Sequence, residues 1–106
     1  MKVRFITPAK LEYLEAIEYY NGEKSGLGYE FAIEVDNTIN RICEFPNAWQ
    51  QVAKRIRKCR LRRFPYGIFY EMKKKELLVI AVMHLHRKPG RWKNRIDEST
   101  REDGAF

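Results

Sequence analysis

In the first half of the chain, apolar residues first recur at every second position, as in a strand, and then at every third or fourth position, as in a helix. Residues 2–5 alternate polar and apolar side chains, which predicts a short strand that ends at Thr7-Pro8. Thr7 is a suitable N-cap with Pro8 at the first helical position, so a helix is expected from there to about residue 22. Its predicted apolar stripe contains Leu11, Tyr13, Leu14, Ile17 and Tyr20. Its predicted solvent-facing side contains Lys10, Glu12, Glu15 and Glu18.

A second helix is predicted over residues 27–44, after a turn at residues 23–26 and before Phe45-Pro46. Its apolar residues recur at intervals of four, four and three: Phe31, Val35, Ile39 and Ile42. Two amphipathic helices joined by a short turn form an antiparallel helical hairpin.

The second half is typical of strands. Residues 47–51 are expected to form a loop, and strands are expected at about 56–64, 68–72 and 76–84, with a lysine turn at 73–75. Residues 77–83 are apolar on both faces, which indicates a central strand. We therefore predict an α+β fold with a four-stranded antiparallel sheet. The N-terminal helical hairpin covers one face of this sheet, and the first strand adds to the edge of a three-stranded meander.

The strand at 56–64 is strongly basic on one side. Lys58, Arg60 and Arg62 share a face because side chains alternate along a strand, while Cys59 and Leu61 share the other. Three like charges in a row repel one another, so a sequence serving stability alone would more often mix acids among them. Two interpretations stay open: a functional cationic face, or a solvated strand whose charges discourage edge pairing.

The two halves of the chain differ in net charge. Residues 1–50 carry five Lys and Arg against eight Asp and Glu, a net of −3, whereas residues 51–106 carry sixteen against six, a net of +10. The basic half favours an anionic partner, either nucleic acid or an acidic protein surface. The chain is long enough for one domain, predicted at residues 1–96, and residues 97–106 lack apolar periodicity and are predicted to be a frayed tail.

Other classes of function are disfavoured. Cys43 and Cys59 match no ligand spacing, so we expect a pair of buried free thiols, no metal site and no cofactor. No apolar run reaches the roughly 18 residues of a membrane span, and the first residues lack a secretory pattern. We therefore expect a soluble, cytoplasmic protein that does not bind membranes.

Several short motifs, in this order, resemble the RelE/ParE superfamily of toxins from bacterial type II toxin–antitoxin systems. They are Glu15-Ala16 before Tyr19-Tyr20, Gly26-Leu27-Gly28 before Phe31, Arg63-Phe64-Pro65-Tyr66 before Ile68-Phe69-Tyr70, and Val82-Met83-His84 leading to Arg87, Pro89 and Trp92. The resemblance covers residues 2–95. It implies a toxin that a cognate antitoxin protein neutralises by wrapping around it.

The superfamily contains two activities. RelE-like toxins cut messenger RNA in the ribosomal A site without a metal, and ParE-like toxins poison DNA gyrase. The resemblance therefore implies either the ribosome with its message or DNA gyrase as the target. A third hypothesis from a different class is a non-catalytic or decayed toxin that still binds its antitoxin and co-represses the operon.

The RelE-like pattern implies a catalytic set for a metal-independent endoribonuclease. Its strand cations fall on Lys58 and Arg60, with Arg62 as a third, and its later arginine falls near Arg87. An arginine that the pattern places after the strand-opening tyrosine falls on Gly67, and its terminal tyrosine falls near Trp92, which cannot act as an acid or base. His84 or His86 could replace the proton shuttle, because imidazole titrates near neutrality. The alternative is that His84 makes a structural hydrogen bond and His86 is merely exposed.

Further residues are candidates for binding nucleic acid or the protein target. Tyr66, at the predicted turn, is the best candidate for a functional hydroxyl. An exposed Trp92, with Arg91 and Lys93 beside it, could stack on a base or anchor a protein partner.

Overall fold

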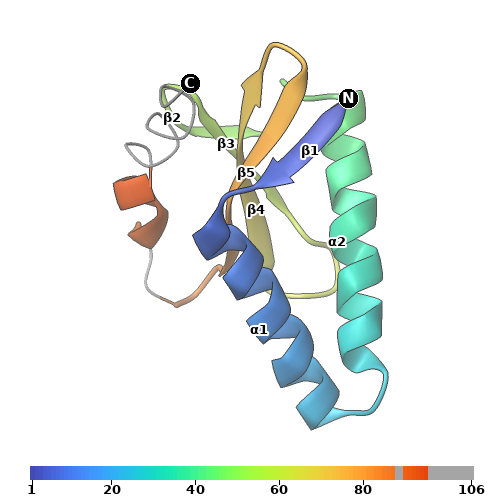
Figure 1. Ribbon diagram of the computed structural model, residues 1–106. Coiled ribbons are helices and arrows are strands. Elements are labelled where there is room, and N and C mark those ends of the chain that lie inside the picture. Colours follow the sequence, from blue (N-terminus) through green and yellow to red (C-terminus); the bar gives the residue numbers. More distant parts are fainter. Residues whose placement is uncertain (88–89, 96–106) are drawn as a thin grey trace.

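The computed structural model describes residues 1–87 and 90–95, with Arg91 described for its backbone alone. Its elements are β1 (Lys2–Phe5), α1 (Thr7–Glu23), α2 (Leu27–Glu44), β2 (Gln50–Ala53), β3 (Ile56–Arg60), β4 (Tyr66–Lys73), β5 (Glu76–His84) and the 3-10 helix η1 (Arg91–Asn94). The strands form one sheet in the order β1-β5-β4-β3-β2. Figure 1 shows the helical hairpin and the sheet, and the predicted tail at 97–106 lies outside the described residues.

The predicted α+β class and the helical hairpin on one face of the sheet are confirmed, as is the meander of β3, β4 and β5. The sheet differs in two details. Residues 50–53, expected largely as loop, form β2, which pairs with β3, and β1 joins the edge of β5 in parallel. An alternating pattern of side chains marks a strand without marking its direction, which explains why the sequence did not reveal the parallel pair.

Helix α2 packs as its spacing predicts. Phe31, Val35, Ile39 and Ile42 are all buried. The apolar run of β5 is likewise buried from Leu77 to Met83. Strands β1 and β4 pair with its two edges, and the helices and η1 cover its two faces. The central-strand prediction is therefore confirmed.

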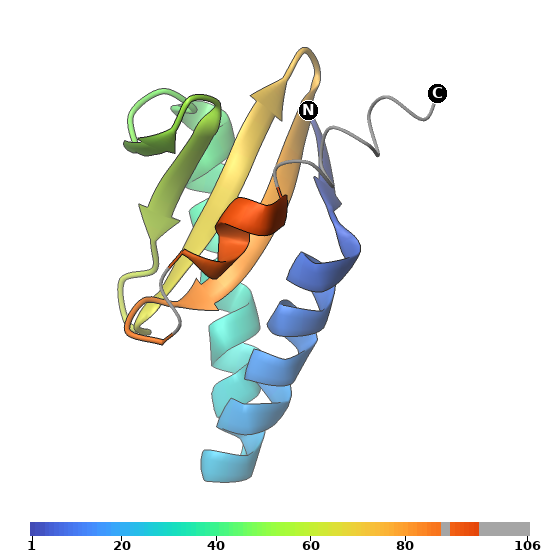
Figure 2. The same cartoon turned by 90° about the vertical axis from the view of Figure 1, so that its left-hand side faces the viewer.

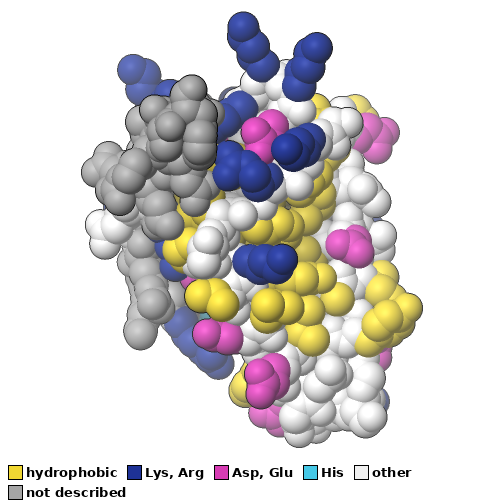
Figure 3. All heavy atoms as spheres, in the orientation of Figure 1, with side chains coloured by type: hydrophobic (Ala, Val, Ile, Leu, Met, Phe, Trp, Pro, Cys, Tyr) yellow, Lys and Arg dark blue, Asp and Glu magenta, His cyan; other side chains and the backbone are white. Residues whose placement is uncertain are grey.

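Helix α1 packs differently from the prediction. Leu11 and Leu14, expected in the apolar stripe, are 53% and 49% exposed. The fully buried positions are Ala9 and Ala16, whose small side chains allow α1 to lie close to β5. Apolar side chains consequently gather on the outer surface over the hairpin (Figure 3). The helix also begins at Thr7 itself, one residue before the predicted start.

The basic strand is shorter than predicted, because the chain leaves the sheet after Arg60. Phe64 then turns into the core, where its ring centre lies 5.1 Å from that of Phe31 and 4.9 Å from that of Tyr20. On the outside of the same loop, Arg63 donates its backbone N–H to Glu34 (2.8 Å) and a guanidinium N–H to Glu30 (2.9 Å). The loop between β3 and β4 is thus tied to α2 on both sides.

No helix in the described part of the chain is long and apolar enough to cross a membrane. Cys59 is buried and Cys43 half-buried, and both are free thiols.

Candidate functional site

Six of the predicted site residues gather at one end of the sheet, which we call the His84 end. The register places Arg60 opposite Gly67 and Tyr66 opposite His84, so the end of β3, the start of β4 and the end of β5 meet there. The His84 end contains Arg60, Arg62, Tyr66, His84, His86 and Arg87. Sequence reasoning therefore identified residues that the fold does bring together.

Lys58, however, lies on the other face of the sheet from Tyr66 and His84. It pairs with Phe69, whose ring stacks on Trp92 of η1 with 5.2 Å between the ring centres. Tyr66 points the opposite way, into the rings of Phe31 and Tyr20 on the helices. Figure 2 shows η1 in front of the sheet and α2 behind it. Arg60, two residues further along β3, shares the face of Lys58. Both strand cations are thus separated from the candidate acid–base groups by the sheet.

The arginine that the RelE-like pattern places at Gly67 would require the side chains of Leu85 and Lys58 to shift. A Cβ built on Gly67 would lie 2.9 Å from Cδ2 of Leu85 and 3.3 Å from Cγ of Lys58. The space beside the glycine is therefore filled by these two side chains.

The prediction of an exposed Trp92 is wrong. The side chain is only 5% exposed, because its ring lies flat against Phe69. Stacking on a base would require η1 to leave the sheet. Lys93 is exposed on η1, while the side chain of Arg91 lies outside the described residues.

A cavity of about 390 Å³ opens at the His84 end between α1 and β5. It combines two carboxylates, two phenols, an imidazole and a guanidinium in one concave surface. Its lining residues are Glu12, Glu15, Ala16, Tyr19, Tyr66, Val82, Met83, His84 and Arg87.

The protonation of the cavity groups follows from their surroundings. Burial raises the pKa of the Tyr66 phenol above its usual 10.0, although the nearby Arg87 opposes the shift. Burial lowers the pKa of His84 below 6.5, and Arg87 and His86 act in the same direction. At neutral pH the cavity therefore holds a protonated phenol and a neutral imidazole.

His84 makes a structural hydrogen bond, as one of the two sequence interpretations anticipated. Its Nδ1 accepts the backbone N–H of His86 at 3.1 Å, and its ring lies 5.3 Å from that of Tyr66. Because Nδ1 is the acceptor, the neutral ring carries its proton on Nε2. His86 itself is exposed.

Arg87 remains available to a partner. It is exposed at the edge of the cavity, and its guanidinium carbon lies 6.0 Å from the centre of the Tyr19 ring, which is the outer limit of a cation–π contact. Arg60 and Arg62 are exposed as well. The His84 end therefore presents three cations to solvent.

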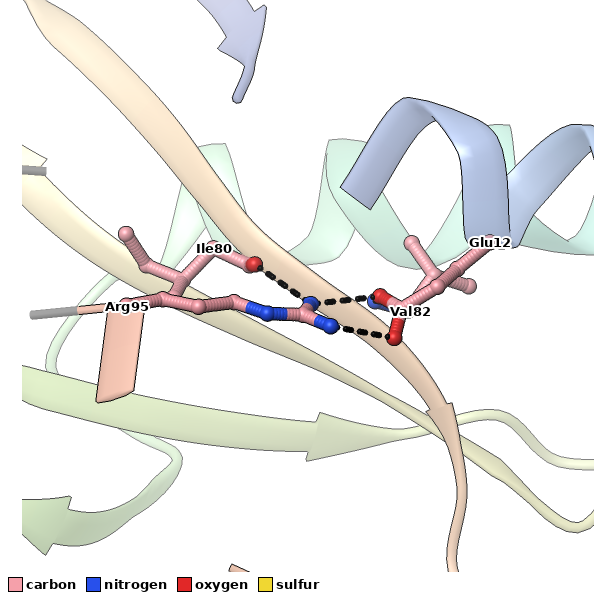
Figure 4. A network of polar contacts seen from close by, with 4 residues as sticks. All are labelled: Glu12, Ile80, Val82 and Arg95. Atoms are coloured by element: carbon pink, nitrogen blue, oxygen red, sulfur yellow. Dashed lines mark hydrogen bonds and ion pairs between the residues drawn. The ribbon is translucent and has the colours of Figure 1, made fainter. Parts of the chain in front are cut away.

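Glu12 and Arg95 were not recognised from the sequence, which placed Glu12 in water. The pairing of β1 with β5 stops at Phe5 and Val79, so the next part of the β5 edge has no neighbouring strand. Glu12 accepts the backbone N–H of Val82 (3.0 Å), and Arg95, as Figure 4 shows, donates to the carbonyl oxygen of Ile80 (3.2 Å). These two side chains supply the hydrogen bonds that another strand would make.

Within the described residues, no three His, Cys, Asp or Glu side chains gather in a way that could hold a metal ion.

Comparison with known proteins identifies the family. A search of curated protein sequences gives no significant match. Among solved structures, the chain resembles one described as the chromosomal ParDE toxin–antitoxin system from P. aeruginosa, with a TM-score of 0.70 and 12% identity, covering 81% of this chain and 97% of that one. At that identity the likeness shows the fold alone.

The family model described as ParE toxin of type II toxin–antitoxin system, parDE, matches residues 3–89. The chain therefore belongs to the ParE toxin family, the toxins of type II toxin–antitoxin systems, and this membership implies a cognate antitoxin as its partner.

Proposed function

We propose that this toxin arrests growth by poisoning DNA gyrase and that it does not cut messenger RNA. The observation that carries the proposal is the separation of Lys58 from Tyr66 and His84 by the sheet. Membership of the ParE family supports the same target, because gyrase poisoning is the activity of the ParE-like branch.

Metal-free RNA cleavage requires a base near the 2′-OH, cations around the phosphorane and an acid for the leaving oxygen, all within hydrogen-bond reach of one phosphate. In this chain the Tyr66 phenol is buried, and Nδ1 of His84 is already occupied by the His86 N–H. Gly67 replaces a cation of the RelE-like set, and Leu85 and Lys58 fill the space beside it. These features support a surface that binds a target over one that performs acid–base chemistry.

The surface we assign to gyrase contact is the exposed part of the His84 end. Arg60, Arg62 and Arg87 project there from three different segments. Arginine is favoured at protein interfaces because its planar guanidinium makes several directed hydrogen bonds and stacks on aromatic rings. Arg87 beside the cavity is the residue expected to contribute most.

The test is a DNA cleavage assay with purified gyrase, plasmid, ATP and the purified toxin. After detergent and protease treatment, linear plasmid should accumulate only when toxin is present. Arg87→Ala should require at least about tenfold more protein, the equivalent of 1.4 kcal/mol of lost contact energy. The matched control is Lys24→Ala, which removes an exposed cation from the turn between the helices and should act like the wild type.

The same preparations go into a translation extract with a defined message, read by primer extension. New A-site stops that depend on Lys58 or Arg87, without linear plasmid, would contradict the proposal and establish the ribosome-dependent nuclease. The absence of both linear plasmid and new stops would also contradict it, and would favour the non-catalytic module that binds an antitoxin and co-represses its operon.

A further inference from the structure

The end of the sheet away from the cavity carries a second, denser group of cations, which we call the lysine end. It is built from the turn between β4 and β5, the turn between β2 and β3 and the start of β1. Strand β4 has eight residues, so the two ends of the sheet are separated by about 25 Å. The lysine end contains Lys2, Lys54, Arg55, Lys73, Lys74 and Lys75.

The backbone holds these cations together. The backbone N–H of Lys2 donates to the carbonyl oxygen of Lys75 at 3.3 Å, and Lys2 is in register with Glu76. Lys73 and Glu76 close the β4–β5 turn as a directly opposed pair. Arg55, from the neighbouring turn, reaches Glu71 on β4 at 3.7 Å. The charges therefore project from a hydrogen-bonded hairpin end, as the Lys and Arg side chains at the top of Figure 3 illustrate.

The acids at this end already have basic partners. Glu71 is contacted by Arg55 and by Lys73, the latter at 3.5 Å, and Glu76 forms an ion pair with Arg4. In the described part of the chain, Lys2, Lys74 and Lys75 are exposed and form no ion pair. Holding several lysines this close costs electrostatic repulsion, which an anionic partner would relieve.

The residues that line the lysine end indicate whether its anionic partner is a protein surface or a nucleic acid. A hollow of about 550 Å³ is lined by Lys2, Lys73, Lys74, Lys75 and Glu76, so neither an aromatic nor an aliphatic residue lines it. Protein interfaces depend on a buried apolar centre with aromatic anchors, whereas binding to a phosphodiester backbone is carried by cations alone. Lysine suits this task because it acts as a mobile point charge that accepts many phosphate positions.

We propose that the lysine end is a binding surface for the phosphate backbone of nucleic acid, independent of base sequence and separate from the His84 end. The ribosome contains RNA and gyrase acts on bound DNA, so the inference does not depend on which of the two targets is correct. Its role would be to hold the toxin on the nucleic acid of its target complex.

The test uses fluorescence anisotropy of the full chain with a labelled 20-base-pair duplex of mixed sequence, over a series of salt concentrations. The variant Lys74→Glu/Lys75→Glu should weaken binding by more than about tenfold. Its plot of log affinity against log salt should be shallower by about 2, because each lost phosphate contact removes about 0.9 from the slope. The matched control, Lys10→Glu/Lys24→Glu, changes net charge equally with two exposed lysines of α1 and the turn after it. Both variants should melt like the wild type.

Equal weakening by the two double variants would overturn the proposal, because net charge alone would then explain binding. Labelled poly-L-glutamate serves as a model of an acidic protein surface. If Lys74→Glu/Lys75→Glu abolished its binding while leaving duplex binding intact, the lysine end would be a protein-binding surface and the proposal would fail. Since the duplex assay contains neither gyrase nor ribosomes, its outcome is independent of the proposed target.

Discussion

Arg95 and Glu12 are 83 positions apart in the chain and form a two-pronged ion pair with N–O distances of 2.7 and 2.9 Å across the open edge of β5. The side chains are only 9% and 19% exposed. The pair joins η1 to α1 and satisfies backbone groups of Ile80 and Val82. One interaction therefore anchors η1 to α1 and closes a strand edge.

Glu12→Ala should lower the free energy of unfolding by about 3 kcal/mol, because it removes the carboxylate that balances the largely buried charge of Arg95 and accepts the Val82 N–H. Urea unfolding followed by circular dichroism measures the change. Glu18→Ala, on the exposed face of the same helix, should stay within about 0.5 kcal/mol of wild type. If Glu12→Ala lowered the free energy of unfolding no more than Glu18→Ala does, the ion pair would not be a stabilising contact.

Phe31→Ala should cost about 3 to 5 kcal/mol, because the ring is fully buried and contacts Tyr20, Phe64 and Tyr66 at centre distances of 5.0 to 5.4 Å. Thermal or urea unfolding reports the loss. Ile33→Ala, on the exposed side of the same helix, should cost less than about 1 kcal/mol. An unmoved melting curve for Phe31→Ala would refute the packing of the hairpin on the sheet.

Gly67→Ala should destabilise the fold by about 1 to 3 kcal/mol, because the added methyl group would press on Leu85 and Lys58. Introducing Leu85→Ala should relieve the clash, so Gly67→Ala should cost less in the Leu85→Ala background than in the wild type. A double-mutant cycle of urea midpoints measures this coupling. Additive effects would mean that the two side chains do not compete for the same space.

The pH dependence of stability should contain a contribution from His84. Its pKa in the fold lies below the 6.5 of an unperturbed histidine, so the unfolded chain binds the proton more readily than the folded one. The stabilisation is complete above pH 6.5 and is lost as pH falls from there through the folded pKa. NMR titration should place the pKa of His84 below 6.5, and Arg87→Ala should raise it by removing one of its causes. A folded pKa at or above 6.5 would contradict the assigned surroundings.

Much of the fold follows from local spacing. The period of Phe31, Val35, Ile39 and Ile42 marked the buried face of α2, and the apolar run of residues 77–83 marked the central strand. Spacing was misleading for α1, where Leu11 and Leu14 have the spacing of a buried helical face but are exposed to solvent. The buried residues of α1 are Ala9 and Ala16, and alanine contributes little to an apolar pattern.

The candidate site was predicted in part. Tyr66, His84 and Arg87 do lie together, because the ends of neighbouring antiparallel strands meet at one edge. Trp92 was placed in solvent because its segment is basic, yet Phe69 lies beneath it. No feature of the sequence distinguished Glu12 from the other glutamates of α1.

The helical hairpin, the order of the strands in the meander and the basic character of the second half could all be predicted from the sequence, because periodicity and charge are properties of neighbouring residues. The tertiary structure decided that Glu12 pairs with Arg95, that Trp92 is buried and that Lys58 and His84 are on different faces. These relationships depend on strand register and on which segment covers each face, and both arise only when distant parts of the chain pack together.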